Sequence, residues 1–562
     1  MTAYKTVVKW GKESIEIEMD PAEGVDGLKQ QLQARTGVPK DRMKIMPKSK
    51  GLWKGVLKDT QDLSALDLSG ISPPIQMLMM GSATLPVEPV KKTVFLEDLP
   101  PEEAAKMVEP SGLVNLGNTC YLNSVTQCLR VVPPLRDGLK SYTPSTTNGV
   151  SQQGQMHALL LKSLLSTLDS LDKSPTAISP NNLVMSTKMS FPQMAQTGPG
   201  GAPMQQDAEE FYSSVMGVCA GEMRGDASLK AAFGGEKPSA EQLDGADNVI
   251  DAVFGLKMEE TLTCDELTTT TTDKDDAMDT DANALVEPPV VTYDLHRKLV
   301  CNIQGGSDSS SQVNITHISE GIQLSLTGKL EKYSDALGRN AQWTRSQKIA
   351  RLPPYLVVQF GRFYWKATPD SQDHAGVKCK VMKPVGFQSV FDVYEFCSDK
   401  VKKVLKVARD KALAEEEDRV AKKLRGEDID EDKKGDATME EDDEEAAALQ
   451  AALAMSVEPE QPPVGPGLPH DFQGLYELFA VVTHKGRDAD GGHYMGWVKA
   501  DNTDSNGSDK KREKIADSDE NNDDWFVFDD DEVSPCKTED ILKLKGGGDW
   551  HMSYLNFYRA KK

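Results

Sequence analysis

Acidic charge in this 562-residue chain is concentrated in three windows, and this distribution limits which segments can form a hydrophobic core. The formal net charge is −24, and acidic residues outnumber basic ones by 8 to 1 in 265–287, by 16 to 7 in 411–445 and by 9 to 4 in 501–524. Such windows bury too little apolar surface to fold by themselves, so we interpret them as solvated insertions. The remainder is nearly neutral and offers no basic face to phosphates, so nucleic acid is not expected as a partner.

The chain has no run of about 18 apolar residues, so we expect no membrane-spanning helix and no membrane partner. Residues 1–19 lack the basic-then-apolar pattern of a signal peptide. These features predict a reducing compartment, the cytoplasm and nucleus. The eight cysteines are then thiols, metal ligands or catalysts rather than disulfides.

Residues 1–80 have the pattern of a small α+β domain. Alternating apolar residues at Tyr4–Trp10 and 14–19 predict two strands separated by a turn at Gly11. A helix and two further strands are predicted next along the chain, at Val25, Leu28 and Leu32 with a cap at Gly37, then at 43–46 and Ile75–Met80. A sheet wrapped on one helix buries this pattern, and its order and length resemble the ubiquitin-like β-grasp fold.

Beyond this domain, the composition predicts a linker and a second, larger domain. Residues 81–108 contain four prolines among mixed charges, which is typical of a semi-rigid linker. We expect a larger α+β domain over 109–561, interrupted by acidic disordered insertions near 265–287, 406–466 and 501–524.

Cys120 is the first candidate for chemistry because it opens a predicted helix. The apolar residues after it follow a helical stripe, which Pro133 and Pro134 close. A cysteine at a helix N-terminus lies among unsatisfied N–H groups and at the positive end of the helix dipole, which favours a thiolate nucleophile. The alternative is a buried structural thiol, a role that Cys128 fits better.

A thiolate nucleophile needs a base and a group that orients the base. His493 follows Gly491 and Gly492, and paired glycines permit close approach of a substrate. Asp529 ends an apolar strand downstream, where a carboxylate can hold the imidazole in one tautomer. His484 lies nearby in a polar Thr-His-Lys-Gly sequence, and we interpret it as a surface residue.

Five segments together resemble the successive conserved boxes of the ubiquitin-specific protease family. They are GLVNLGNTCYLNSVTQ (112–127), QQDAEEF (205–211), LPPYLVVQFGRF (352–363), GGHYMGWV (491–498) and WFVFDDDEVS (525–534). This resemblance implies a papain-like catalytic domain of thumb, palm and fingers, without a cofactor. The N-terminal domain ending in MMGSA (79–83) and the segment TEDILKLKGGGDWHMSY (538–554) are similar to the proteasome-associated branch of that family.

The resemblance implies a role for each matching residue. Cys120 corresponds to the nucleophile, His493 to the general base and Asp529 to the orienting acid, with Asp530 beside it. Asn115 corresponds to the side-chain donor of the oxyanion hole, together with the backbone N–H of Cys120.

The same resemblance implies which residues hold the extended C-terminal tail of ubiquitin. Asp207 would bind its backbone, although the sequence equally predicts Asp207 as the N-cap of a helix starting at Ala208. The other implied contacts are Gln206, Gly491, Gly492 and Tyr494. Residues 486–490 correspond to a loop that blocks the cleft until the proteasome is engaged.

Two further segments concern zinc and ubiquitin binding. The cysteines that follow residue 260 form no CxxC pair, so we expect no zinc ribbon and no other metal site. The alanine-rich segment after the acidic run at 440–445 resembles a ubiquitin-interacting helix, and the alternative is a helical linker. One helical face would carry Leu449, Ala452, Leu453 and Ser456.

We therefore expect a cysteine isopeptidase that removes ubiquitin from proteins on the 26S proteasome and so recycles ubiquitin. Its partners would be ubiquitin, polyubiquitinated proteins and the proteasome regulatory particle, the last bound through residues 1–80. The alternatives are a non-catalytic ubiquitin-binding regulator of the proteasome and an adaptor acting mainly through residues 1–80. The presence of every residue type that the triad needs favours the enzyme.

Overall fold

The computed structural model describes residues 3–81, 110–144, 151–267, 287–304, 314–367, 376–425, 464–487, 491–500 and 523–561, apart from the single residues 12, 50, 67, 69 and 199. Its contacts divide the chain into two compact units, Met1–Pro101 and Glu102–Lys562. Each unit has a hydrophobic core of its own.

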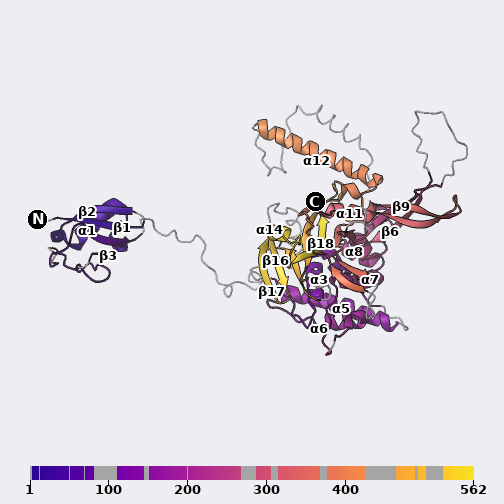
Figure 1. Ribbon diagram of the computed structural model, residues 1–562, viewed down its shortest axis with the longest axis horizontal. Coiled ribbons are helices and arrows are strands. Elements are labelled where there is room, and N and C mark those ends of the chain that lie inside the picture. Colours follow the sequence, from indigo (N-terminus) through magenta and orange to yellow (C-terminus); the bar gives the residue numbers. More distant parts are fainter. Residues whose placement is uncertain are drawn as a thin grey trace, which may run out of the picture. The chain divides into compact units, whose positions relative to one another are not determined.

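The first unit is a four-stranded sheet with one helix packed on it (Figure 1). Its elements are β1 (Tyr4–Trp10), β2 (Glu13–Met19), α1 (Gly24–Thr36), β3 (Lys44–Pro47) and β4 (Ile75–Met80). The strand order is β2-β1-β4-β3, with β1 and β4 parallel and the other neighbours antiparallel. This arrangement is the β-grasp fold, as the sequence predicted.

Helix α1 of the first unit lies against the sheet through the residues that the sequence spacing indicated. Leu28 and Leu32 of α1 are buried, as is Val8 of β1. The helix ends at Gly37, whose φ of 68° allows its N–H to bond the carbonyl of Gln33. A side chain at this left-handed position would be strained, so the predicted glycine cap has a physical reason.

The second unit contains a group of helices around the buried helix α3. All side chains of α3 are buried, and Val125 and Leu129 share one core with Phe211. The helices are α3 (Cys120–Arg130), α4 (Pro133–Ser141), α5 (Gln152–Lys173), α6 (Asn181–Ser190), α7 (Ala208–Glu222), α8 (Asp226–Ala232), α9 (Ala240–Leu243) and α10 (Val249–Val253).

A large sheet packs against α3. Its strands are β7 (Leu299–Cys301), β10 (Tyr355–Phe360), β13 (Val390–Asp392), β14 (Leu475–Lys485), β15 (His493–Lys499), β16 (Asp524–Asp529), β17 (Glu532–Lys537) and β18 (Met552–Ala560). The order is β17-β16-β15-β14-β18-β10-β7, and β13 pairs with β14. Helix α3 contacts β14, β15 and β16, so the start of α3 lies next to the strands that carry the candidate histidine and aspartates.

A second, antiparallel sheet extends from this body (Figure 1). Its order is β6-β5-β9-β8, with β5 (Leu256–Cys264), β6 (Val290–His296), β8 (Thr327–Ser334) and β9 (Arg339–Arg351). The remaining elements are α11 (Ile318–Leu326), α12 (Asp399–Arg425), α14 (Thr538–Leu542) and a hairpin of β11 (Phe363–Ala367) and β12 (Gly376–Lys380). The helices, the large sheet and this long sheet are the thumb, palm and fingers that the resemblance implied.

Helix α12 corrects one boundary of the predicted insertions. The sequence predicted disorder from residue 406, but the helix continues to Arg425. Its first turns are anchored by the buried side chains of Val401 and Leu405. Its later turns carry ion pairs one turn apart, including Lys422 with Asp418 at 2.8 Å, and such pairs stabilise an exposed helix.

Candidate active site

The loop before Cys120 is shaped by its own side chains. The Asn115 side-chain oxygen accepts hydrogen bonds from the N–H groups of Gly117 (3.0 Å) and Thr119 (3.2 Å). The Thr119 hydroxyl accepts one from the N–H of Leu116 at 2.9 Å. Gly117 and Asn118 both have positive φ, 92° and 55°, which a glycine and an asparagine tolerate best. The loop therefore delivers Cys120 to the first position of α3 in a fixed geometry.

Cys120 and Cys128 differ in their surroundings although both lie on α3. Cys120 begins the helix and is 3% exposed. Cys128 is fully buried, and burial raises the pKa of its thiol. A thiol that resists ionisation is inert, so Cys128 fits the structural role that the sequence suggested for it.

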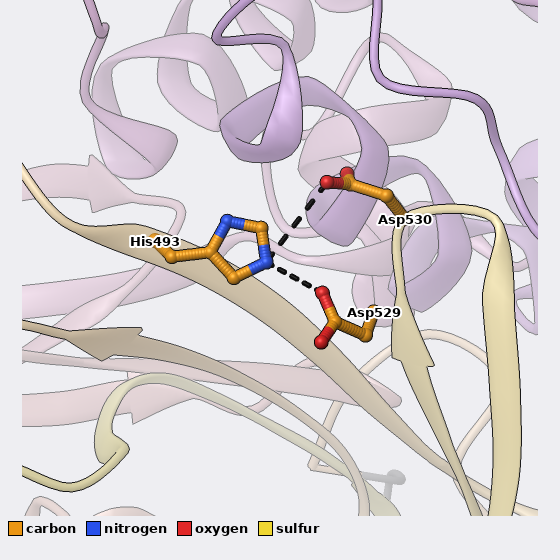
Figure 2. A group of neighbouring side chains, drawn as sticks. All are labelled: His493, Asp529 and Asp530. Atoms are coloured by element: carbon orange, nitrogen blue, oxygen red, sulfur yellow. Dashed lines mark hydrogen bonds and ion pairs between the residues drawn. The ribbon is translucent and has the colours of Figure 1, made fainter.

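His493 is the first residue of β15 and joins Cys120 to Asp529. Its Nε2 lies 2.6 Å from Oδ1 of Asp529, which ends β16 (Figure 2). The Cys120 side chain interacts with the same imidazole, and Nδ1 is the ring nitrogen that Asp529 leaves free. The bond with Cys120 first, and then the bond with Asp529, raise the pKa of His493 to about 9. The imidazole is thus held in its protonated form at neutral pH, as a thiolate–imidazolium pair requires.

Asp530 lies on the other side of Nε2 but is engaged by two asparagines. Its Oδ2 is 3.9 Å from Nε2 of His493 (Figure 2). The side-chain amide of Asn115 donates to Oδ2 and that of Asn123 to Oδ1, both at 2.8 Å. The structure therefore places Asn115, the predicted oxyanion donor, beside the triad with its amide nitrogen bonded to Asp530.

Asp207 has the helix-capping contacts that the sequence gave as one of its two roles. Its Oδ1 accepts from the N–H of Glu209 at 2.8 Å and from the Tyr554 hydroxyl at 2.7 Å. Its Oδ2 faces Lys378 of β12 at 3.7 Å. Binding of the ubiquitin tail by Asp207 remains a prediction. Tyr494 is buried close to this carboxylate, and burial followed by Asp207 raises its pKa.

The two adjacent glutamines of the second box point to different places. Gln206, predicted to contact the ubiquitin tail, donates to the carbonyl of Met204 at 3.2 Å. Gln205 instead donates to the carbonyl of Gly492 at 2.8 Å and lies 3.9 Å from the sulfur of Cys120. The sequence argument missed Gln205, although its box was identified, because neighbouring identical residues do not indicate which one faces the cleft.

His484 is not the surface residue that the sequence suggested. It is 1% exposed in β14, and Lys380 of β12 donates to its Nδ1 at 2.5 Å. Burial first and then the Lys380 cation lower the pKa of His484 to about 3, so its ring is neutral. Lys380 also donates to the carbonyl oxygens of His484 (3.2 Å) and Gly486 (2.7 Å). Burial lowers the pKa of Lys380 to about 7.

Gly492, the residue before His493, is required by close packing. Gly492 has a φ of 118°, and a Cβ there would lie 2.2 Å from the carbonyl oxygen of Lys485 and 2.7 Å from Cε1 of His484. Any side chain at Gly492 would therefore collide with the Lys485 backbone and the His484 ring. Of the predicted gating segment 486–490, Arg487 forms an ion pair with Asp549, and 488–490 lie outside the described residues.

Three side chains place atoms that could bind a metal ion within 4.8 Å of one another, those of His493, Asp529 and Asp530. Among the described residues, this is the group that satisfies that spacing. These atoms are already used, because Nε2 shares a proton with Asp529 and Asp530 holds two amides. These contacts account for the convergence of the three side chains. The predicted ubiquitin-interacting face at 449–456 lies outside the described residues.

The comparison with known families agrees with this geometry. The profile of the family described as ubiquitin carboxyl-terminal hydrolase matches residues 111–558, which include every residue of this candidate active site. The chain belongs to this family. As a ubiquitin carboxyl-terminal hydrolase it is a cysteine deubiquitinase, and its substrates carry ubiquitin.

Relatives align with this hydrolase along its whole length. Ubiquitin carboxyl-terminal hydrolase 6 of Arabidopsis thaliana is 36% identical over 99% of this chain and 98% of its own. Ubiquitin carboxyl-terminal hydrolase 6 of Schizosaccharomyces pombe is 30% identical, and ubiquitin carboxyl-terminal hydrolase 14 of Caenorhabditis elegans is 26% identical, over 98% and 93% of their lengths. The similarity therefore includes the β-grasp unit. Among the described residues, no helix has the length and apolarity needed to cross a bilayer.

Proposed function

We propose that Cys120, His493 and Asp529 are the nucleophile, the acid–base and the orienting group of this deubiquitinase. The observation that carries the assignment is the position of the His493 imidazole, which bonds Asp529 through Nε2 at 2.6 Å and interacts with the Cys120 side chain. Asp530 supports the chain from the side by holding the Asn115 loop and Asn123. This is the arrangement by which a nucleophile, a base and an orienting acid act together.

The acylation step follows from the protonation states. The Cys120 thiolate attacks the carbonyl carbon of the C-terminal glycine of ubiquitin, and negative charge develops on the carbonyl oxygen. The backbone N–H of Cys120 and the amide of Asn115 are the proposed donors to that oxygen. As the C–N bond breaks, the His493 imidazolium gives its proton to the leaving lysine amine, and a thioester remains.

Deacylation reverses these roles. The imidazole, now neutral, accepts a proton from a water molecule as that water attacks the thioester carbonyl. The C–S bond breaks, ubiquitin leaves with a free carboxylate, and the thiolate–imidazolium pair is restored. Asp529 holds Nε2 throughout, so Nδ1 faces the reacting atoms in both steps.

This assignment is tested by hydrolysis of ubiquitin carrying a fluorogenic amide at its C-terminus. We expect activity in the full chain and its loss in His493→Ala. His551→Ala is the control, because His551 is a buried histidine just before β18 and outside the proposed triad. Equal rates for His493→Ala and the unmutated enzyme would contradict it. Inactivity of the unmutated chain with and without proteasome would favour the alternative, a non-catalytic regulator.

We further propose that the enzyme acts on proteasome-bound substrates, recycles ubiquitin, and works in the cytoplasm and nucleus. The support is an apolar face on the β-grasp sheet. Met46 and Leu78 lie opposite each other on β3 and β4, and Lys9 lies beside Leu78 on β1. Met80 is 45% exposed on the same face, whereas Met77, whose side chain lies on the opposite face of β4, is buried. An apolar patch with lysines at its edge fits a partner surface with an apolar centre and acidic rim.

This part of the proposal is tested by co-sedimentation of the full chain with purified 26S proteasome. We expect Leu78→Glu to abolish co-sedimentation while leaving hydrolysis by the free enzyme unchanged, because the catalytic centre lies in the other unit. Gln33→Glu is the matched control, since it adds the same carboxylate on the exposed side of α1. Co-sedimentation of correctly folded Leu78→Glu at the unmutated level would refute docking through this face.

A further inference from the structure

Gln205 reaches the nucleophile from a segment whose backbone is fixed on both sides. Before it, the N–H of Met204 bonds the carbonyl of Gln196 at 3.0 Å, and the side chain of Asn118 donates to the carbonyl of Pro203 at 2.8 Å. After it, Asp207 caps α7. Asn118 belongs to the loop that positions Cys120, so the backbone of Gln205 and the nucleophile loop are tied to each other.

The side-chain amide of Gln205 bridges two parts of the site that are far apart in the sequence. Nε2 donates to the carbonyl oxygen of Gly492 at 2.8 Å and lies 3.9 Å from the Sγ of Cys120. Gly492 immediately precedes His493. One amide group therefore connects the backbone just before β15, which begins with His493, to the sulfur of Cys120.

A primary amide suits this bridge because it carries two N–H donors and stays neutral over the working pH range. One donor satisfies the Gly492 carbonyl, and the other can point to the sulfur. A hydrogen bond to an ionised acceptor is stronger than one to a neutral acceptor, so the contact stabilises the thiolate more than the thiol. A lysine there would compete as an ion-pair partner, and a glutamate would repel both acceptors.

Asn115 does not supply the same contact in this structure. Its amide nitrogen donates to Asp530, and its oxygen accepts from the nucleophile loop. The amide of Gln205, 3.9 Å from the Cys120 sulfur, is thus free to make the contact that Asn115 does not make.

We propose that Gln205 is a further catalytic residue of this enzyme, whose amide stabilises the Cys120 thiolate and holds the Gly492–His493 strand end over it. The proposal rests on Cys120 being the nucleophile. It assigns no change to the bond-making steps. Gln205 lowers the free energy of the thiolate state from which acylation starts, and it keeps the imidazole within reach of the sulfur.

The test measures the thiolate directly by alkylation with iodoacetamide across a pH series, using the full chain and mass spectrometry of the peptide that contains Cys120. We expect Gln205→Ala to move the midpoint of Cys120 alkylation up by about one pH unit, since one unit corresponds to the differential strength of a modest hydrogen bond. Gln205→Glu moves it further in the same direction, because it adds a like charge beside the sulfur.

Steady-state kinetics give the second readout. Loss of a hydrogen bond to a charged group corresponds to roughly a 10-fold to 100-fold fall in rate, so we expect that fall in kcat for Gln205→Ala with a fluorogenic ubiquitin amide. KM should change less than threefold. Gln205→Asn keeps the amide but is one methylene too short to reach both acceptors, so it should lie between Gln205→Ala and the unmutated enzyme. Gln196→Ala, an exposed glutamine on the same connecting segment, is the matched control.

Each outcome has one meaning. If Gln205→Ala and Gln205→Glu are folded by circular dichroism and keep both the alkylation midpoint and kcat of the unmutated enzyme, the inference is overturned. If kcat falls but the midpoint stays, stabilisation of the thiolate is overturned. If Cys120→Ser retains full hydrolysis, the nucleophile assignment fails first, which is distinct from a failure at Gln205.

Discussion

Asp530 is the residue whose replacement best separates the support of the site from its chemistry. Its side chain is 8% exposed, and its two oxygens each accept a side-chain amide at 2.8 Å, from Asn115 and Asn123. Asp529, by contrast, is 46% exposed and bonds His493. Asp530→Ala leaves two amide donors without their acceptor, and one of them, on Asn123, is only 2% exposed, so water cannot replace the lost acceptor there.

The size of the effect follows from these two bonds. Hydrogen bonds to a charged acceptor contribute about 1.5–3 kcal/mol each, and two bonds to one carboxylate are not fully additive. Asp530 also has a φ of 55°, which alanine tolerates less well than aspartate, at a cost of about 1 kcal/mol. We therefore expect Asp530→Ala to lower the free energy of unfolding by about 3–5 kcal/mol. Asp530→Asn tolerates the backbone but turns a donor toward one of the two amides, so it should lose about half as much.

The assay is urea denaturation of the full chain, followed by fluorescence and by the residual hydrolysis of a ubiquitin amide. The matched controls are Asp531→Ala and Asp531→Asn, because Asp531 is the exposed neighbour with the same charge. Asp529→Ala should lose activity with little change in stability. An unfolding free energy of Asp530→Ala within 1 kcal/mol of the unmutated enzyme would refute the view that this carboxylate holds the Asn115 loop and helix α3 in place.

Three further predictions concern the base, its anchor and a glycine. Because the pKa of His493 is raised to about 9, kcat/KM should fall as the pH rises through about 9 and the imidazolium loses its proton. Asp529→Asn should shift this fall to lower pH. An unshifted pH profile for this variant would contradict the pairing of His493 with Asp529. Lys380→Met removes three hydrogen bonds, to the His484 ring and to the carbonyl oxygens of His484 and Gly486. Because this segment leads to His493, kcat should fall about 10-fold with an unchanged circular dichroism spectrum. An unchanged kcat would exclude an anchoring role for Lys380. Gly112→Ala brings a Cβ within 2.6 Å of the backbone oxygens of Asp530 and Asp531. Thermal denaturation should therefore show that the free energy of unfolding falls by about 1–3 kcal/mol, whereas the control Gly548→Ala, in open space, should leave it unchanged. Equal stability of the two variants would be the contrary result.

The elements that could be predicted from the sequence are those whose local residue pattern is sufficient to specify them. The β-grasp unit was predictable because its strands alternate and its helix has a single apolar stripe ending at Gly37. Helix α3 was predictable from the apolar spacing after Cys120, but it ends at Arg130, and the two prolines expected to close it begin α4 instead. Cys120, His493 and Asp529 could be named from their boxes. Their meeting depends on a sheet order that no local pattern contains.

The errors have equally physical causes. His484 follows threonine and precedes lysine and glycine, a polar sequence, yet β14 is paired on both sides by β15 and β18, and the hairpin residue Lys380 covers its ring. Burial of this kind comes from neighbours distant in the chain. Helix α12 extends further than composition indicates because its opposite charges are spaced one turn apart, a detail that a net-charge count loses.

Gln205 shows a limit of a different kind. Gln205 and Gln206 are chemically identical neighbours, so composition and motif give them equal weight. The course of the backbone into the cap of α7 decides that Gln205 faces Cys120 and that Gln206 turns to Met204. Side-chain direction at such a position can be obtained from coordinates alone.

The most direct test of the central claim is the reaction of the full chain with ubiquitin that carries an electrophile in place of its C-terminal carboxylate. The account predicts one ubiquitin added per chain, with mass spectrometry placing the new thioether at Cys120, and no adduct in Cys120→Ser. An adduct on any of the other seven cysteines, or undiminished labelling of Cys120→Ser, would contradict it.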